Sequence, residues 1–218
     1  MEFFSHLVDI ALHLDKHLVQ LVADYGVLSY GILFIIIFAE TGFVVTPFLP
    51  GDSLLFAVGA VAGTGGLDIV SICILLILAG FLGNTVNYSI GRKIGPMIYH
   101  RESRFIKREY LLKAQAFFEK HGSIAVIGSR FLPIFRTFVP FVAGIGQMNR
   151  ARFLLYNFVG AVLWVLPFVL GGYFFGQVPA VKNNFTLVIV AILVVTVMPA
   201  AVAGLKEYRL RKKAARQS

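Results

Sequence analysis

The chain has 218 residues, of which 58% are hydrophobic and only 14% are charged, and its mean hydropathy is +0.81. These values exclude a soluble globular protein and predict an all-α polytopic membrane protein. The net charge of +9 does not indicate nucleic-acid binding, because most Lys and Arg residues fall in two blocks that flank apolar segments. No metal-ligand, nucleophile or phosphate-loop motif appears in the sequence, so we expect neither a metal nor a cofactor.

The N-terminal segment, residues 1–24, predicts an amphipathic helix that lies in the membrane interface. It lacks the basic start and the cleavage site of a secretory signal, so we expect it to be retained. Its apolar residues recur near helical spacing, at Phe3, Leu7, Ile10, Leu14 and Leu18. We expect residues 25–205 to form the membrane domain and residues 206–218 to form a basic cytoplasmic tail.

Two short apolar runs follow, at residues 27–39 and 53–63. At a rise of about 1.5 Å per residue each run reaches about 20 Å or less, whereas the hydrocarbon layer is about 30 Å thick. The segment that joins them, ETGFVVTPFLPGD, contains two carboxylates, two prolines and two glycines. We therefore predict a re-entrant hairpin over residues 27–63 that enters the membrane and returns, shaped by Pro47, Pro50 and Gly51.

Longer apolar segments have about 20 residues each and predict three full transmembrane helices, at residues 69–90, 153–176 and 185–204. The segment GNTVNYSIGRK, residues 83–93, is expected to end the first of these spans, with Gly91 and Arg92 at the cytoplasmic edge. Residues 110–122 form a second amphipathic stretch, which predicts another interfacial helix.

Residues 123–146 also have the length of a span, but they contain Arg130 and Arg136. An arginine at the bilayer centre costs about 2.5–3.5 kcal/mol on insertion scales. Six residues apart, the two side chains would point about 120° away from each other on a straight helix, so one face could not shield both. We predict a second re-entrant hairpin over residues 123–146, broken and shaped by Pro133, Pro140 and Gly144.

The basic residues test this topology. Residues 92–120 contain eight Lys or Arg and residues 206–216 contain six, which predicts that both segments, and so the C-terminus, are cytoplasmic. An even number of crossings must separate them, and this holds only if residues 123–146 enter and return. Residues 63–68 have no basic residue and are predicted outside, together with Lys182. Two broken hairpins that enter from opposite faces predict an inverted repeat.

Four ionisable residues lie in these hairpins: Glu40 and Asp52 in the first, Arg130 and Arg136 in the second. Irregular backbone at membrane depth is tolerated where it lines a cavity, and ionisable residues there indicate function. Three simpler interpretations remain open: an N-cap for Asp52, a structural ion pair for Glu40, and interfacial snorkelling for the arginines. The arginine pair is typical of an anion clamp, because a guanidinium fork matches phosphate oxygens.

Residues 83–93 supply two further candidates, Asn84 and Arg92, for a supporting role in the site. The simpler interpretation is helix contact through small residues, and it is favoured for Gly83, Gly91 and Arg92.

Four motifs occur in order: FAETGFVVTPFLPGDSLLF, GNTVNYSIGR, FFEKHG and SRFLPIFRTFVPFVAGIG. Together they resemble the DedA family of bacterial inner-membrane proteins, also called the SNARE-associated or VTT domain, over roughly residues 25–205. The resemblance implies two opposed re-entrant hairpins, a required acidic pair at Glu40 and Asp52, and a required arginine pair at Arg130 and Arg136. It departs at Asn84, where many members have aspartate, so proton coupling at that position is in doubt.

The resemblance also implies a role in envelope maintenance that depends on the proton-motive force, and in recycling undecaprenyl phosphate across the inner membrane. The leading hypothesis is a non-enzymatic transporter in which the arginines bind the lipid phosphate and the carboxylates couple protons. Alternatives are a proton-coupled cation antiporter, a lipid phosphatase and a structural partner of other membrane proteins. The expected partners are polyprenyl phosphate or another anionic lipid, protons and membrane lipids, without nucleic acid, and a homo-oligomer is left open.

Overall fold

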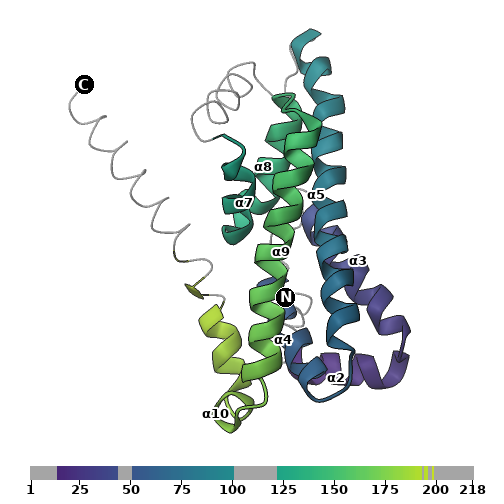
Figure 1. Cartoon of the computed structure of the whole chain (residues 1–218), viewed down its shortest axis with the longest axis vertical. Coiled ribbons are helices and arrows are strands. Elements are labelled where there is room, and N and C mark those ends of the chain that lie inside the picture. Colours follow the sequence, from purple (N-terminus) through teal and green to yellow (C-terminus); the bar gives the residue numbers. More distant parts are fainter. Residues whose placement is uncertain (1–13, 44–50, 101–121, 193, 196–197, 199–218) are drawn as a thin grey trace, which may run out of the picture.

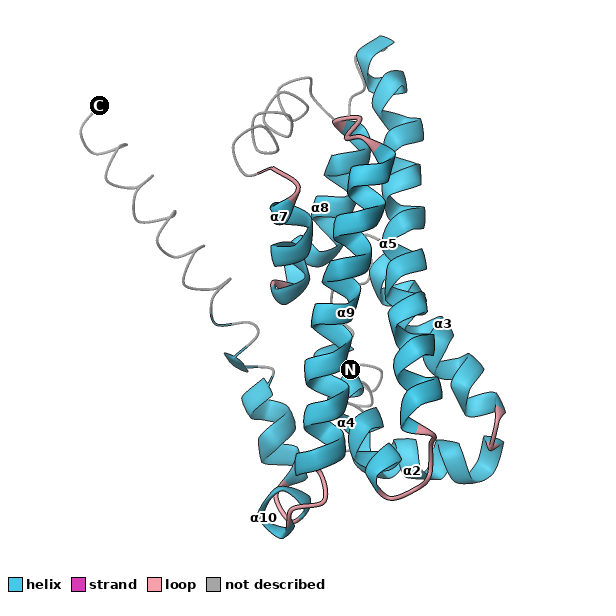
Figure 2. Cartoon of the chain, viewed as in Figure 1, coloured by secondary structure: helices cyan, strands magenta, loops and turns pink. Residues whose placement is uncertain are grey.

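A computed structural model describes residues 14–43, 51–100, 122–192, 194–195 and 198. Within these residues every regular element is helical (Figure 2). The elements are α2 Leu14–Tyr25, α3 Leu28–Gly42, α4 Gly51–Gly63, α5 Ile69–His100, α7 Ile124–Gly128, the 3-10 helix η1 Ser129–Phe131, α8 Pro133–Ile145, α9 Arg150–Phe175 and α10 Pro179–Lys182. The predicted all-α class is therefore confirmed for the described part of the chain.

The two long helices α5 and α9 run side by side through the molecule (Figure 1). Their segments Ile69–Gly95 and Arg150–Phe175 have mean hydropathies of 2.4 and 2.1, and both are long and apolar enough to cross a membrane. Each begins at a side-chain cap: Asp68 accepts a hydrogen bond from the Ser71 amide, and Asn149 accepts one from the Arg152 amide.

The predicted span at residues 69–90 lies within α5, and the helix continues beyond it to His100. Arg92, within the continued helix, donates from Nη1 to the Tyr88 hydroxyl at 2.7 Å and to the Met148 carbonyl oxygen at 3.2 Å. The Arg92 side chain is thus hydrogen-bonded to its own helix and to the turn before α9, and it does not terminate the helix.

The first pair of helices enters the bundle and turns back. The start of α3 lies beside the start of α5, where the Asp68 amide donates to the Tyr30 hydroxyl at 2.8 Å. Its end lies against the middle of α5, where a Cβ on Gly42 would be 3.4 Å from the Gly83 Cα. From there α4 starts at Gly51 and returns to the α10 end of the molecule (Figure 1). Pro47 and Pro50 lie outside the described residues.

The second pair comes from the opposite end. Val126 packs with Phe153 near the start of α9, and Arg130 reaches the middle of α5 and α9. The backbone is extended at Leu132, and Pro133 is the first residue of α8, which returns to the end of α5. The predicted break is therefore confirmed at Leu132–Pro133.

The role given to Pro140 was wrong, because α8 continues through it. Proline in a helix removes one backbone hydrogen bond, which neighbouring helices can compensate for in an apolar bundle. Gly144 has a different effect from the predicted one: it lets α8 approach α5, since any Cβ there would clash with the Tyr88 carbonyl oxygen.

The return helix of each pair packs against the long helix of the other half: α4 against α9, and α8 against α5. Glycines make both approaches close. A Cβ on Gly172 of α9 would clash with the Phe56 carbonyl oxygen of α4, and one on Gly91 of α5 would clash with the Phe141 carbonyl oxygen of α8.

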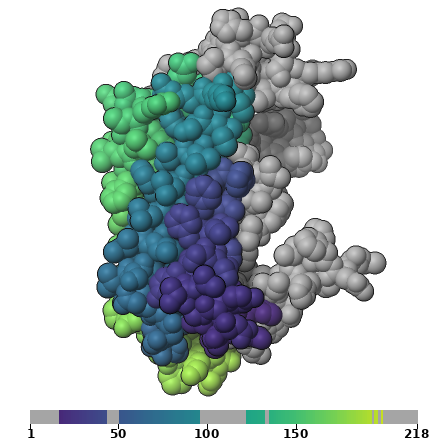
Figure 3. Space-filling view, turned by 90° about the vertical axis from the view of Figure 1, so that its right-hand side faces the viewer, coloured from purple at the N-terminus to yellow at the C-terminus, as the bar shows by residue number. Residues whose placement is uncertain are grey.

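Large apolar side chains are exposed on the outer sides of these helices, for example Ile35, Ile74, Leu78 and Leu163. Figure 3 shows α3 and α5 forming one continuous face. Soluble monomers rarely expose so many large apolar residues together, whereas a lipid-facing surface does.

Several predicted segments fall partly or wholly outside the described residues. Residues 14–24 of the N-terminal segment are helical, as predicted. Residues 185–192, 194–195 and 198 of the third predicted span are also helical. Residues 1–13, most of the second interfacial stretch and the basic tail are not described.

Candidate functional site

The tips of the two helix pairs meet in the middle of the molecule, where Arg136 joins the two carboxylates. Its Nη1 donates to Glu40 Oε1 at 2.8 Å and its Nη2 donates to Asp52 Oδ1 at 2.5 Å. The side chains of all three residues are at most 6% exposed. Three of the four predicted site residues, which lie up to 96 residues apart in sequence, therefore form one buried ion cluster.

Asp52 has a second partner in the cluster. It is the second residue of α4, and its Oδ1 also accepts a hydrogen bond from Trp164 Nε1 at 2.7 Å. The position in the first turn suits a carboxylate, because the positive end of the helix dipole lies there. Its hydrogen bonds to Arg136 and Trp164 show that Asp52 links three elements, which a simple cap would not do.

Glu40 lies in the last turn of α3, at the unfavourable end of that helix dipole. Only Oε1 is bonded to Arg136; Oε2 has no hydrogen-bond partner among the described residues. Oε2 lies against the backbone of Gly51, where any Cβ would clash with the carboxylate. Glycine at position 51 thus allows the start of α4 to lie against Glu40.

Trp164 places its ring beneath both guanidinium groups. The Arg136 Cζ lies 4.4 Å from the ring centroid and the Arg130 Cζ lies 5.7 Å from it. Such cation–π contacts are worth about 2 kcal/mol or more when they are desolvated, and Trp164 is fully buried. One side chain therefore holds Asp52 by its N–H and both arginines by its ring.

Arg130 is completely buried, so the snorkelling interpretation is excluded for this residue. Its Nη2 donates to Asn157 Oδ1 at 2.6 Å and to the Gly80 carbonyl oxygen at 3.1 Å. Its Nε and Nη1 have no hydrogen-bond partner, and it forms no ion pair, among the described residues. A buried guanidinium with unused donors is costly unless an anion satisfies it.

Glycines form the slot that holds Arg130. A Cβ on Gly80 of α5 would lie 3.2 Å from its Nη1, and a Cβ on Gly160 of α9 would lie 3.1 Å from its Cδ. The side chain thus crosses between the two long helices at a point where neither carries a side chain.

Amide side chains of α5 complete the surroundings of the cluster. With its nitrogen facing the Thr41 carbonyl oxygen, Asn84 donates to that oxygen at 3.1 Å and accepts from Arg130 Nη2 at 3.1 Å. One turn on, Asn87 donates to the Thr137 carbonyl oxygen at 2.7 Å and so holds the tip of the second helix pair. Asn84 therefore lies at the site, as predicted, whereas Arg92 bonds to Tyr88 and Met148 away from it.

The sequence interpretation missed three residues: Trp164, Asn157 and Asn87. A signal was present for all three, since Asn87 is a polar residue within the predicted span 69–90. Trp164 is the single tryptophan of the chain, and Asn157 is a polar residue inside the apolar segment 153–176. A polar residue in a membrane span usually faces a protein partner, which here is Arg130.

The formal charges of the cluster cancel, since two carboxylates oppose two guanidinium groups. The pairing is unequal, however: Arg136 binds both carboxylates and Arg130 binds neither. Arg130 can therefore accept an anion without breaking an existing pair. The described residues contain no group of three or more His, Cys, Asp or Glu side chains that could hold a metal ion.

Comparisons with known proteins identify the family of the chain. Residues 49–174 match the model of the VTT domain family. The chain is 48% identical to Protein DedA of Escherichia coli K12 over 219 aligned positions, covering 99% of this chain and all of that protein. It is 43% identical to Uncharacterized membrane protein Rv0364 of Mycobacterium tuberculosis H37Rv, covering 84% of this chain and 82% of that one.

A more distant relative is Inner membrane protein YqjA of Escherichia coli K12, at 36% identity over 69% of each chain. No solved structure matches the chain. The family match covers both long helices and three of the four charged site residues, and the relatives extend it over the whole chain. The chain therefore belongs to the DedA family of VTT-domain membrane proteins.

Proposed function

We propose that this protein is an inner-membrane transporter of lipid phosphate, that undecaprenyl phosphate is its substrate, and that the proton-motive force drives it. The observation that carries the proposal is the buried cluster in which Arg136 is paired with two carboxylates while Arg130 keeps unused donors. An inner-membrane location is supported by the name of the relative YqjA.

In this proposal the two helix pairs are re-entrant hairpins. Each pair reaches only the middle of α5 and α9, and the two pairs start from opposite ends of those helices. If α5 and α9 cross the membrane, the cluster lies near its midplane. Discontinuous helices that meet at the midplane are typical of inverted-repeat transporters. The N-terminal turn of α8 also directs its dipole toward the cluster, which favours a bound anion.

Charge balance links the anion to protons. A phosphomonoester carries a charge of about −1.5 to −2 near pH 7, which would unbalance a buried cluster whose charges cancel. Protonation of Glu40 and Asp52 would release Arg136, so that both guanidinium groups face the phosphate. Loss of those protons on the other side would return Arg136 to the carboxylates and expel the phosphate. The polyprenyl chain stays in the surrounding lipid.

The test is transport of undecaprenyl phosphate between the leaflets of reconstituted vesicles, with and without a proton gradient. We expect wild-type protein to respond to the gradient. Arg130→Ala abolishes transport because it removes the donors that would bind the phosphate, and Glu40→Gln retains binding but loses the response to the gradient. Arg92→Ala is the matched control, because it removes an arginine outside the cluster. Normal transport by Arg130→Ala, or none by wild type, would refute the proposal.

The same vesicles discriminate the other functions. Cation-dependent loss of the pH gradient without lipid phosphate would indicate an antiporter, although Arg136 already binds both carboxylates that a cation would need. Release of inorganic phosphate would indicate a lipid phosphatase.

A further inference from the structure

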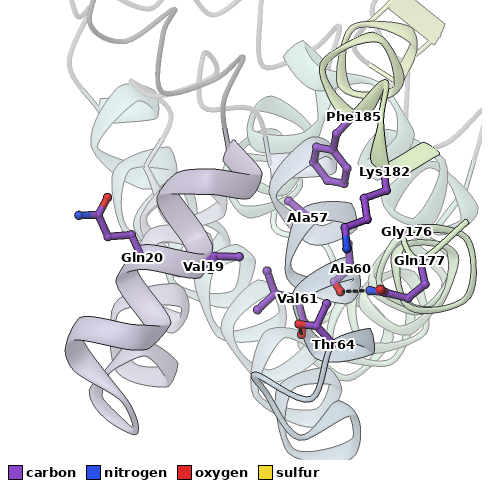
Figure 4. Close-up of a pocket in the computed structure, with 10 residues that line it drawn as sticks. All are labelled: Val19, Gln20, Ala57, Ala60, Val61, Thr64, Gly176, Gln177, Lys182 and Phe185. Carbon is purple, nitrogen blue, oxygen red and sulfur yellow. Dashed lines mark hydrogen bonds between the residues drawn. The ribbon is translucent and has the colours of Figure 1, made fainter. Parts of the chain in front are cut away.

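A cavity of about 390 Å³ lies at the α10 end of the molecule, away from the charge cluster (Figure 4). It lies between α2, the second half of α4 and the segment that follows α9. Its volume is within the range of about 300–1,000 Å³ that is usual for small-molecule sites. None of the four charged residues of the cluster lines it.

The walls of this cavity are mostly apolar, formed by Val19 of α2, Ala57, Ala60 and Val61 of α4, and Phe185. Figure 4 shows Val19 pointing toward Val61 across the cavity. The Gln177 amide is already bonded to the Ala60 carbonyl oxygen at 2.8 Å. Water gains little from such walls, whereas a hydrocarbon chain buries apolar surface against them.

One cation, Lys182, lies among the lining residues. Its side chain points toward Gln177 and the wall formed by α4 (Figure 4). Its ammonium group has neither a hydrogen bond nor an ion pair with any described residue. An unpaired ammonium at the edge of an apolar cavity complements a ligand with an anionic head and an apolar body.

We infer that this cavity binds an anionic lipid, with the phosphate on Lys182 and the first part of its hydrocarbon chain between α2 and α4. The idea that this cavity is a docking site for transported lipid rests on the proposed function. The idea that it binds an anionic lipid does not. Its wall leads toward the cluster, since Ala57 is five residues after Asp52 on α4, about 7.5 Å along the helix. Lipid bound there would lie one to two turns from the central site.

The experiment measures equilibrium binding of a polyprenyl monophosphate to the full-length protein in nanodiscs of neutral lipid. Arg130→Ala protein is used first, so that the central site does not contribute. We expect Lys182→Ala to weaken binding about tenfold, as for loss of one charge-assisted hydrogen bond, and Lys182→Arg to restore it. Val19→Trp fills the cavity from an exposed position and should also weaken binding.

Lys93→Ala is the matched control, because Lys93 is an exposed lysine near the other end of α5. Neutral polyprenol and inorganic phosphate should compete poorly, since each lacks one half of the ligand. Labelling of wild-type protein by a photoreactive polyprenyl monophosphate, mapped to α2 and the second half of α4, avoids any dependence on the folding of Arg130→Ala. Unchanged affinity and labelling in Lys182→Ala would overturn the inference.

The two proposals fail separately. If the lipid binds at Lys182 but wild-type protein moves no lipid between leaflets, the transport function is wrong and the docking site stands. If Lys182→Ala transports with an unchanged half-saturating lipid concentration and binds normally, the docking site is wrong and transport stands. If both hold, Lys182→Ala raises that concentration with little change in the maximal rate.

Discussion

Replacing Arg136 by methionine tests whether the central cluster is held together by charge pairing. Methionine fills a similar volume but provides no charge and no donor. The substitution leaves the Glu40 and Asp52 carboxylates buried, each at most 6% exposed, without their cation. Breaking a buried pair in this way costs about 3–5 kcal/mol, because the remaining charges are uncompensated.

The contact with Trp164 adds to this cost. The Arg136 Cζ is 4.4 Å from the ring centroid, and a desolvated contact of that kind contributes about 2 kcal/mol. For a chain of 150–250 residues, 1 kcal/mol corresponds to about 2–4 °C in Tm. We therefore expect Arg136→Met to lower the Tm by about 10–30 °C.

The assay is thermal unfolding of purified protein in detergent, followed by circular dichroism. The decisive comparison is the triple variant Glu40→Gln, Asp52→Asn and Arg136→Met, which removes both unpaired carboxylates and leaves Arg130, already without an ion pair in the wild type, as the one charge of the cluster. We expect it to recover most of the lost stability, while its transport stays abolished. Arg92→Met, which removes a partly buried arginine outside the cluster, should cost about 1 kcal/mol.

Two results would refute this reasoning. A Tm for Arg136→Met equal to that of wild type would show that the carboxylates need no cation. A triple variant as unstable as Arg136→Met would show that the loss comes from packing rather than from unpaired charge.

Three further substitutions test other contacts. Trp164→Phe keeps a ring beneath the arginines but removes the hydrogen-bond donor to Asp52. We expect thermal unfolding to show about 1–2 kcal/mol lower stability, and lipid transport to be slower. Lipid transport at the wild-type rate would contradict this. Asn84→Asp places a third carboxylate in the cluster, beside the guanidinium of Arg130, and should weaken lipid-phosphate binding about tenfold. Unchanged affinity in equilibrium binding would show that a carboxylate at position 84 does not compete with the phosphate for Arg130. Gly172→Leu should prevent the close approach of α4 and α9 and lower the yield of folded protein on size-exclusion chromatography, while Gly31→Ala, with open space around it, should not.

Local sequence signals were sufficient to predict the two pairs of short helices. The apolar runs 27–39 and 53–63 are too short to cross a membrane, and the structure turns between α3 and α4 as their length predicts. The break at Leu132–Pro133 was also local, because proline constrains the residue before it. Pro140 carried the same signal and was misread, since the cost of a proline inside a helix depends on neighbours that a sequence does not show.

The sequence predicted the span within α5 but not the continuation of the helix to His100, for a related reason. Residues 83–93 contain asparagine, glycine and arginine, which often mark a helix end. In the structure Asn87 donates to α8 and Arg92 donates to the turn before α9, so the polar groups have partners and the helix continues. The hydrogen-bond partners of these polar side chains lie in segments about 50 residues away in the sequence.

The four charged site residues were predicted from one physical fact: ionisable side chains are rare in membrane segments unless they have a function. Their types and their places in the two segments follow from the sequence. Their pairing does not, because Glu40 and Asp52 meet Arg136 only after α3, α4 and α8 converge. The sequence interpretation treated the two arginines alike, whereas Arg130 has two nitrogen atoms without a hydrogen-bond partner among the described residues and each nitrogen of Arg136 has one.

By itself, the sequence determined that this is a helical membrane protein with two pairs of short helices carrying opposite charges, because hydropathy, segment length and proline act over a few residues. The tertiary structure alone decided which arginine is paired, where Trp164 and Asn157 lie, and that α4 packs on α9 while α8 packs on α5. These features depend on distances between residues that are far apart in the chain. Close helix packing at glycine contacts sets those distances, and no local sequence pattern encodes them.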